Sequence, residues 1–232
     1  MIFAEESENL QSSKRAYKQL SLHIKQLLRE NKDIEANSLI PVLYLLVGII
    51  AENSLMQSIR RDKVSDRVVD SVKTQRDIKS KWLKFVEESV KFHFDKEIDD
   101  LEPASKQKYE ELISFINQEL SDLITIRNRL VHGQFTIVFN SARNDISNIL
   151  TNKIQSINFY DVEILYHMFI DVFYDMFWHV SVAPDAFTDQ FDKKYQKYTE
   201  IKSRYSHEKF SSFSNDLKRR GRKVSIERSK RD

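Results

Sequence analysis

The scarcity of residues that break helices constrains this chain more than any other feature. Only three glycines and three prolines are spread over 232 residues. Such a chain favours long helices over many short strands, because strand connections recruit glycine and proline. Charged residues make up 31% of the sequence, as expected for helices with one wet face. The sequence therefore predicts an all-α fold, an antiparallel helical bundle.

Apolar residues recur at helical spacing along most of the chain. Good capping residues precede several of these segments, and Gly133 is a stop signal. The second helix should begin near Asn37 or Ser38, with Pro41 in its first turn. The expected helices cover residues 7–31, 37–61, 64–94 with a break near 74–79, 106–132 after a Ser105 cap, 159–182 after an Asn158 cap, and 188–205.

Residues 134–157 differ from this pattern. Phe135, Ile137 and Phe139 alternate with polar neighbours, and residues 149–157 are β-like in part. A short β-hairpin insertion near 134–157, turning around Asn144-Asp145, is therefore predicted within the helical domain. That domain should span residues 1–183, with its core over 39–182. Residues 184–232 form a polar extension with a basic tail.

Composition limits the chemistry and the compartment. The sequence contains no cysteine, which excludes disulfides, thiolate nucleophiles and cysteine zinc sites. The first residues are acidic and lack an apolar signal run, so secretion is not expected. The most apolar stretch, residues 39–51, ends at Glu52. It is too short to span a bilayer and favours a buried helix, so we expect a cytoplasmic protein with no membrane association.

Charge is unevenly distributed, although the formal net charge is only +2. Residues 218–232 hold eight Lys/Arg against two Asp/Glu, so the rest of the chain is mildly acidic. This pattern is compatible with a tail that tethers a partner and with a solvated, disordered terminus.

One helical stripe contains a charge where an apolar residue belongs. Arg127 lies on it, and its other members are Ile116, Leu120, Leu123 and Leu130. An arginine there needs a carboxylate, a phosphate or polar groups across an interface as a partner, since an unpaired buried charge is costly. Glu52 lies on a second stripe and either pairs with Arg127 or reaches water at the stripe's edge.

Asn128 and His132 lie on the same half of that helix as Arg127. Arginine suits phosphate, histidine exchanges protons near neutral pH, and asparagine can orient either a side chain or a substrate. A helix C-terminus alone also favours Arg, His and then Gly in this order. The residue types therefore permit either phosphoryl transfer without a metal or a simple helix end.

Arg127-Asn128-x-x-x-His132 resembles the Arg-polar-x-x-x-His motif of the HEPN superfamily. The resemblance covers about residues 39–182. It implies a metal-independent endoribonuclease that needs no cofactor and acts as a homodimer, with the active site at the dimer interface. Arg127 would stabilise the scissile phosphate, His132 would act as general acid or base, and Asn128 would orient His132 or the substrate. Glu52 would support this set.

The same resemblance implies RNA as substrate, and a toxin or anti-phage defence role with an antitoxin or defence-system partner. One departure is Gln134, because some such toxins carry a tyrosine there that antitoxins modify. Two alternatives stay open: a non-catalytic HEPN-type module that binds nucleotide or RNA or serves in assembly, and a helical scaffold. Arg127 locked to an internal carboxylate with His132 isolated would favour the scaffold.

A second set of polar residues has metal-ligand spacing. His167, Asp171, Asp175 and His179 lie four apart on an otherwise apolar helix. Such side chains can share a metal, but an apolar helix also needs one wet stripe. We favour the wet stripe and predict no metal site.

Overall fold

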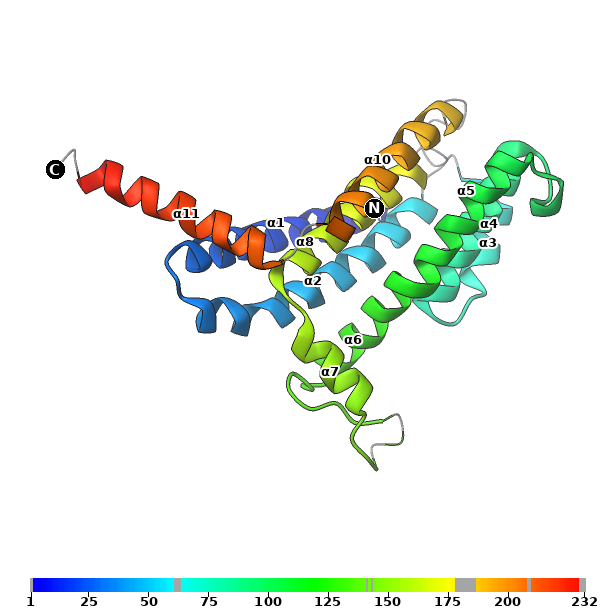
Figure 1. Cartoon of the computed structure of the whole chain (residues 1–232). Coiled ribbons are helices and arrows are strands. Elements are labelled where there is room, and N and C mark those ends of the chain that lie inside the picture. Colours follow the sequence, from blue (N-terminus) through cyan, green and yellow to red (C-terminus); the bar gives the residue numbers. More distant parts are fainter. Residues whose placement is uncertain are drawn as a thin grey trace.

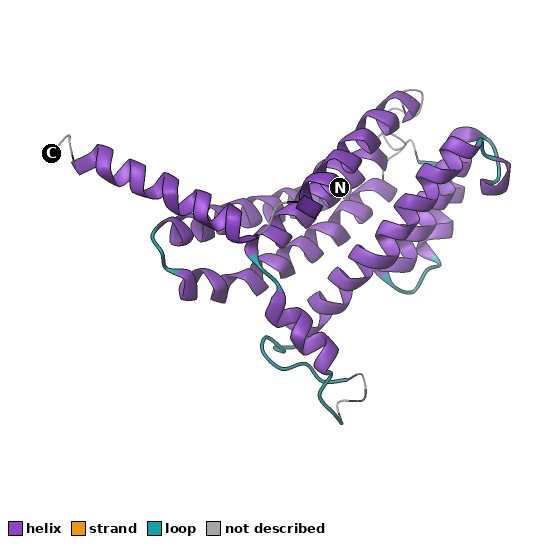
Figure 2. Cartoon of the chain, in the orientation of Figure 1, coloured by secondary structure: helices purple, strands orange, loops and turns teal. Residues whose placement is uncertain are grey.

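The computed structural model describes residues 2–60, 64–140, 142, 144–177, 187–207 and 210–229. Within these ranges every regular element is a helix (Figure 2), which confirms the all-α prediction. The elements are α1 (Ile2–Arg29), α2 (Asp33–Ile59), α3 (Asp66–Lys73), α4 (Ile78–Phe94), the 3-10 helix η1 (Ile98–Asp100), α5 (Pro103–Phe115), the π-helix η2 (Ile116–Leu120), α6 (Ser121–Val131), α7 (Asn148–Ser156), α8 (Phe159–Tyr166), the π-helix η3 (His167–Tyr174), α10 (Phe187–His207) and α11 (Phe210–Ser229).

Helix α2 is the central helix of the bundle and packs against α1, α6 and α8 (Figure 1). Leu43, Val47 and Ile50 are fully buried, and the indole N–H of Trp82 donates a hydrogen bond of 3.2 Å to the Ala51 carbonyl. By length and composition alone α2 could cross a membrane. Its packing is that of a core helix, as predicted for residues 39–51, and is consistent with a soluble protein.

The start of α2 corrects one prediction. The helix begins at Asp33, several residues before the expected caps Asn37 and Ser38. Asp33 and Glu35 lie in its first turn, where carboxylates interact favourably with the helix dipole. Pro41 is consequently inside the helix and not in the first turn, so it supplies no backbone N–H to the turn before it.

The break predicted near 74–79 separates α3 from α4. Asp77 is the N-cap of α4, and its carboxylate accepts a hydrogen bond of 2.9 Å from the backbone N–H of Ser80. Ser65 caps α3 in the same way through the N–H of Val68. Local capping residues therefore account for this boundary.

Helices α5, η2 and α6 form one continuous rod (Figure 1). The rod agrees with the helix predicted over 106–132, except that it starts at Pro103 in place of a Ser105 cap. Proline suits the first helical turn because it has no N–H to satisfy. The π-helical turn at η2 was not predicted.

The predicted β-hairpin is wrong as a hairpin. Phe139 and Ile146 form a single antiparallel bridge, and the Asn140 N–H donates to the Asp145 carbonyl at 2.9 Å. The chain therefore reverses where predicted, but the described residues contain no strand. Residues predicted as β-like from 149 onward belong to α7, which buries Ile154. Two short segments joined by one bridge do not make a stable sheet, and here the Val138 N–H donates to the Thr151 hydroxyl of α7 at 3.0 Å.

In the C-terminal extension the described residues 187–207 and 210–229 are helical, and α11 packs on the bundle. Phe213 of α11 lies 5.1 Å from Tyr160, between ring centroids, and Leu217 is buried. At Gly221 an added Cβ would come within 2.9 Å of the Arg29 carbonyl oxygen, so α11 crosses α1 closely. The basic tail therefore begins as packed helix, which the interpretation as a disordered terminus did not predict.

Candidate active site at the end of helix α6

Arg127 lies on the apolar stripe predicted for the rod. Ile116, Leu120, Leu123 and Leu130 are at most 2% exposed, whereas the Arg127 side chain is 30% exposed. Asn128 and His132 are exposed. The rod thus buries one face against the bundle and brings these three polar residues to its C-terminal end.

Gly48 of α2 makes room for the Arg127 side chain. A Cβ built on Gly48 would lie 2.8 Å from the Arg127 Cγ and 3.0 Å from its Cβ. Both distances are shorter than ordinary van der Waals contact. The aliphatic stem of Arg127 therefore lies on the backbone of α2, and only glycine permits this approach.

The Arg127 guanidinium is held by two partners. Its Nη2 atom lies 2.9 Å from Oε2 of Glu52, and its Nη1 donates to Oδ1 of Asn128 at 3.1 Å. The Nε atom is buried and has no hydrogen-bond partner among the described residues. The Glu52 side chain is 45% exposed, so it both pairs with Arg127 and reaches water. The two placements considered for Glu52 are therefore both correct.

His132 ends α6 as part of a capping motif. The Gly133 N–H donates to the Leu130 carbonyl at 3.0 Å, and the Gln134 N–H donates to the Arg129 carbonyl at 3.0 Å. Gly133 has a φ of 76°, the left-handed conformation that glycine adopts readily. These bonds form a Schellman motif, which fixes the backbone that carries His132.

The His132 imidazole makes no hydrogen bond with any residue that the structure describes, and it faces solvent. Gln134, by contrast, is 8% exposed and accepts a hydrogen bond of 3.0 Å from the Phe139 N–H. The structure thus connects Glu52, Arg127 and Asn128 directly, whereas the His132 side chain is exposed to solvent.

Exposed apolar side chains surround this end of the rod, and the loop that carries most of them projects beyond the bundle together with α7 (Figure 1). We call them the apolar rim. Its members are Val131, Phe135, Ile137, Phe139, Ile146 and Ile149, the last of which is 81% exposed. The sequence does not reveal this surface, because apolar residues that alternate with polar ones are also the pattern of a strand.

The His167 stripe is occupied by internal pairs. His167 Nδ1 lies 2.6 Å from Oδ2 of Asp171, and Asp175 pairs with Lys194 of α10. Burial acts to raise the pKa of Asp171, but the hydrogen bond and charge of His167 outweigh it and lower that pKa. His179 lies outside the described residues. Within the described part of the chain no group of three potential ligands could hold a metal.

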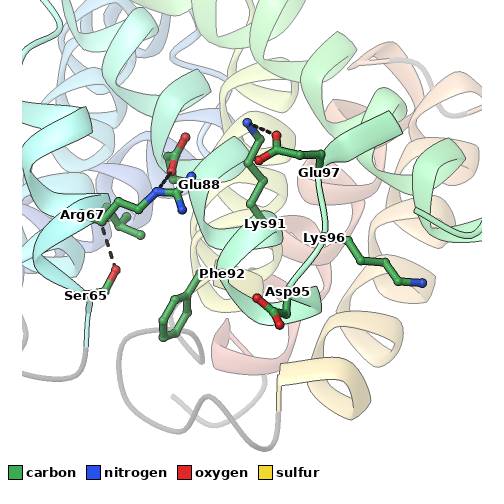
Figure 3. Close-up of a pocket in the computed structure, with 9 residues that line it drawn as sticks. Ser65, Arg67, Glu88, Lys91, Phe92, Asp95, Lys96 and Glu97 are labelled. Carbon is green, nitrogen blue, oxygen red and sulfur yellow. Dashed lines mark hydrogen bonds and ion pairs between the residues drawn. The ribbon is translucent and has the colours of Figure 1, made fainter. Parts of the chain in front are cut away.

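A hollow of about 360 Å³ lies between α3 and α4 (Figure 3). Its charged side chains neutralise one another: Arg67 Nε lies 3.3 Å from Glu88 Oε2, and Lys91 Nζ lies 2.7 Å from Glu97 Oε2. These pairs explain its polar lining without a ligand, so the end of α6 is the stronger candidate site.

Comparison of the chain with protein-family models, with curated proteins and with solved structures found no match. The resemblance to the HEPN superfamily therefore depends on the Arg127 motif and its setting.

Proposed function

We propose that this protein is a HEPN-type, metal-independent endoribonuclease with Arg127, Asn128 and His132 as its catalytic residues. The observation that carries the proposal is a guanidinium fixed at the solvent edge by Glu52 and Asn128, followed by an exposed histidine. A fixed cation and a proton-exchanging group are what phosphodiester cleavage by an internal nucleophile requires.

The proposed reaction uses the 2′-hydroxyl of RNA as nucleophile. The 2′-oxygen attacks the adjacent phosphorus, the bond from phosphorus to the 5′-oxygen breaks, and the products are a 2′,3′-cyclic phosphate and a 5′-hydroxyl. The 2′-hydroxyl proton goes to a base, and an acid protonates the leaving 5′-oxygen. Arg127 offers further N–H donors to the phosphoryl oxygens, whose charge increases in the transition state.

A homodimer supplies both proton-transfer groups. One His132 cannot act as base and acid in the same step, but two copies of the motif facing one another provide a histidine for each role. The apolar rim beside the motif is the surface that we propose two chains bury, because exposed apolar patches commonly mark interaction sites. By the same resemblance we propose a cytoplasmic toxin or defence effector that is controlled by an antitoxin or defence-system partner.

A scaffold role is the second candidate, and a specific contact favours it. Arg127 is locked to Glu52 while its stem rests on Gly48, so the arginine also fastens α6 to α2. Against this, the pair is partly exposed, and exposed pairs contribute little stability. A non-catalytic module that binds nucleotide or RNA or serves in assembly is the outcome to expect if His132 proves dispensable.

The test is RNA cleavage in EDTA. Purified wild-type protein is incubated with total RNA and with tRNA beside His132→Ala, and beside His23→Ala as a matched loss of an exposed histidine. Wild type and His23→Ala should cleave and leave cyclic-phosphate ends, whereas His132→Ala should not. If wild type is folded and dimeric but cleaves nothing, the binding or assembly role replaces the enzymatic one.

Arg127→Met separates catalysis from scaffolding, because methionine keeps an unbranched stem over Gly48 and removes the guanidinium. For an enzyme, cleavage should fall by about 100-fold or more, while the free energy of unfolding changes by less than about 1 kcal/mol. A larger loss of stability with cleavage intact would establish the scaffold.

A further inference from the structure

A second cavity opens between η2, α8 and α10, and it has the character of a ligand site. Its volume is about 310 Å³, within the range of pockets that bind small molecules. Apolar side chains form much of it, with polar groups among them. The lining residues are Ser114, Phe115, Gln118, Glu119, Asp161, Ile164, Leu165, Met168, Tyr198 and Lys202.

Both π-helical segments of the described chain contribute to this cavity. Gln118 and Glu119 belong to η2, and Met168 belongs to η3. π-helical turns are rare, and they occur frequently at functional sites. Two π-helical segments at one cavity are an observation independent of the volume of the cavity.

The charges of the cavity are unbalanced. The Glu119 carboxylate makes no hydrogen bond or ion pair with the residues that the structure describes. The Asp161 carboxylate on the α8 wall accepts a hydrogen bond of 2.6 Å from the side-chain amide of Asn158, which carries no charge. The one cation of the lining, Lys202, lies over the Tyr198 ring at 5.7 Å from the centroid. Burial and the neighbouring Asp122 raise the pKa of Glu119 by more than the charges of Lys153 and Lys202 lower it, so these two lysines do not fully compensate the carboxylate.

We propose that this cavity binds a small organic amine, an ammonium group attached to an aromatic or branched aliphatic body. The body fits against Phe115, Leu165 and Met168, and the ammonium group meets Glu119. Two carboxylates against one ammonium in the lining favour a cationic ligand over an anionic one. Glu119 lies eight residues before Arg127, about 12 Å along the rod, so this site is separate from the proposed RNA site.

The experiment uses the full chain with ¹³C-labelled methionine methyl groups. It is titrated with 2-phenylethylamine, with the neutral 2-phenylethanol and with 3-phenylpropanoate, which share a phenyl ring. The Met168 methyl resonance should shift saturably with the amine, at least about fivefold more weakly with the alcohol, and not with the carboxylate. Met56, which does not line the cavity, serves as internal reference.

Glu119→Gln should weaken amine binding about tenfold and leave alcohol binding unchanged, because it removes the charge but keeps the shape. Glu110→Gln, at an exposed position of α5, makes the same change in net charge and should have no effect. The proposal is overturned if the alcohol binds as tightly as the amine, if the Met168 resonance does not respond, or if the two variants behave alike.

Discussion

At the residue scale, the contact between Gly48 and Arg127 joins the candidate site to the central helix α2. The sequence placed Arg127 on a buried stripe, because position within a helix depends only on local spacing. It could not show that Gly48 lies opposite, since the contact joins two helices far apart in the chain. Pairing with Glu52 was weighed from stripe positions alone, and the ion pair confirms it.

Replacing Gly48 by alanine should therefore destabilise the protein despite alanine's better helix propensity. The propensity gain is about 1 kcal/mol, but forcing a methyl group against Arg127 costs about 1–3 kcal/mol. We expect a net loss of about 1 kcal/mol in urea denaturation. In an Arg127→Ala background the 2.8 Å approach to Cγ no longer exists and only the 3.0 Å approach to Cβ remains, so the same substitution should cost less. An equal loss in both backgrounds would contradict this contact.

At the element scale, boundaries set by local chemistry were predictable and those set by packing were not. The Asn158 cap accepts a hydrogen bond from the Asp161 N–H as expected, and Gly133 ends α6. The start of α2 lies before the expected caps Asn37 and Ser38, and no residue pattern in the sequence marked the π-helical turns. The β-like pattern after residue 134 gave a wrong prediction. Phe135, Ile137 and Phe139 alternate with polar residues but are exposed, so the alternation does not mark the buried face of a strand.

Gly133→Ala tests the end of α6. No atom lies within 4 Å of where its Cβ would be, so the cost is purely that of a left-handed backbone, about 1–2 kcal/mol. Gly133→Asn should cost less, because asparagine tolerates this conformation better. Chemical denaturation of the two variants measures the difference. Equal losses would mean that side-chain contacts, and not the backbone, decide the position.

Asp77 gives α4 a stability that depends on pH. The hydrogen bond from the Ser80 backbone lowers the pKa of Asp77 below its ordinary 3.8. A lowered folded-state pKa means that the contribution is complete above the ordinary value and disappears as pH falls through the lowered one. Asp77→Ala should lose about 1 kcal/mol at pH 7, and its deficit against wild type should shrink as pH falls below 4.

Asp77→Asn is the control for this effect. Asparagine caps about as well as aspartate but does not titrate, so this variant should retain its cap in acid. If the deficit of Asp77→Ala is the same at pH 7 and at pH 3, the charged cap is not its cause.

At the scale of the whole molecule, the bundle places one polar end beside an apolar rim. Long helices and an all-α class followed from the lack of breakers. The arrangement of the helices did not, because the same apolar stripes can pair in many ways. The packing of α11 on α1 could not be predicted from the sequence either. The composition of this segment shows that it is basic, but not that Gly221 allows the two helices to cross closely.

Ile149→Asp tests the rim as a surface between two copies. Ile149 is 81% exposed, so the substitution should change the stability of one chain by less than about 0.5 kcal/mol. Burying an unpaired aspartate in an interface is costly, so dimer affinity should fall at least about tenfold in analytical ultracentrifugation. Ile34→Asp, at an equally exposed isoleucine of α2, should leave the dimer intact. If both variants remain dimeric, the rim is not the interface.

The π-helical turn at η2 also bears on how chains of this kind diverge. Such a turn holds one residue more than an α-helical turn could, and one residue corresponds to about 100° of rotation around the axis. Descendants of a common ancestor that lost this extra residue would show a single deletion inside an unbroken helix, between Phe115 and Ser121. The residues equivalent to Arg127 and His132 would still be five positions apart, but each would lie one residue closer to the start of the rod.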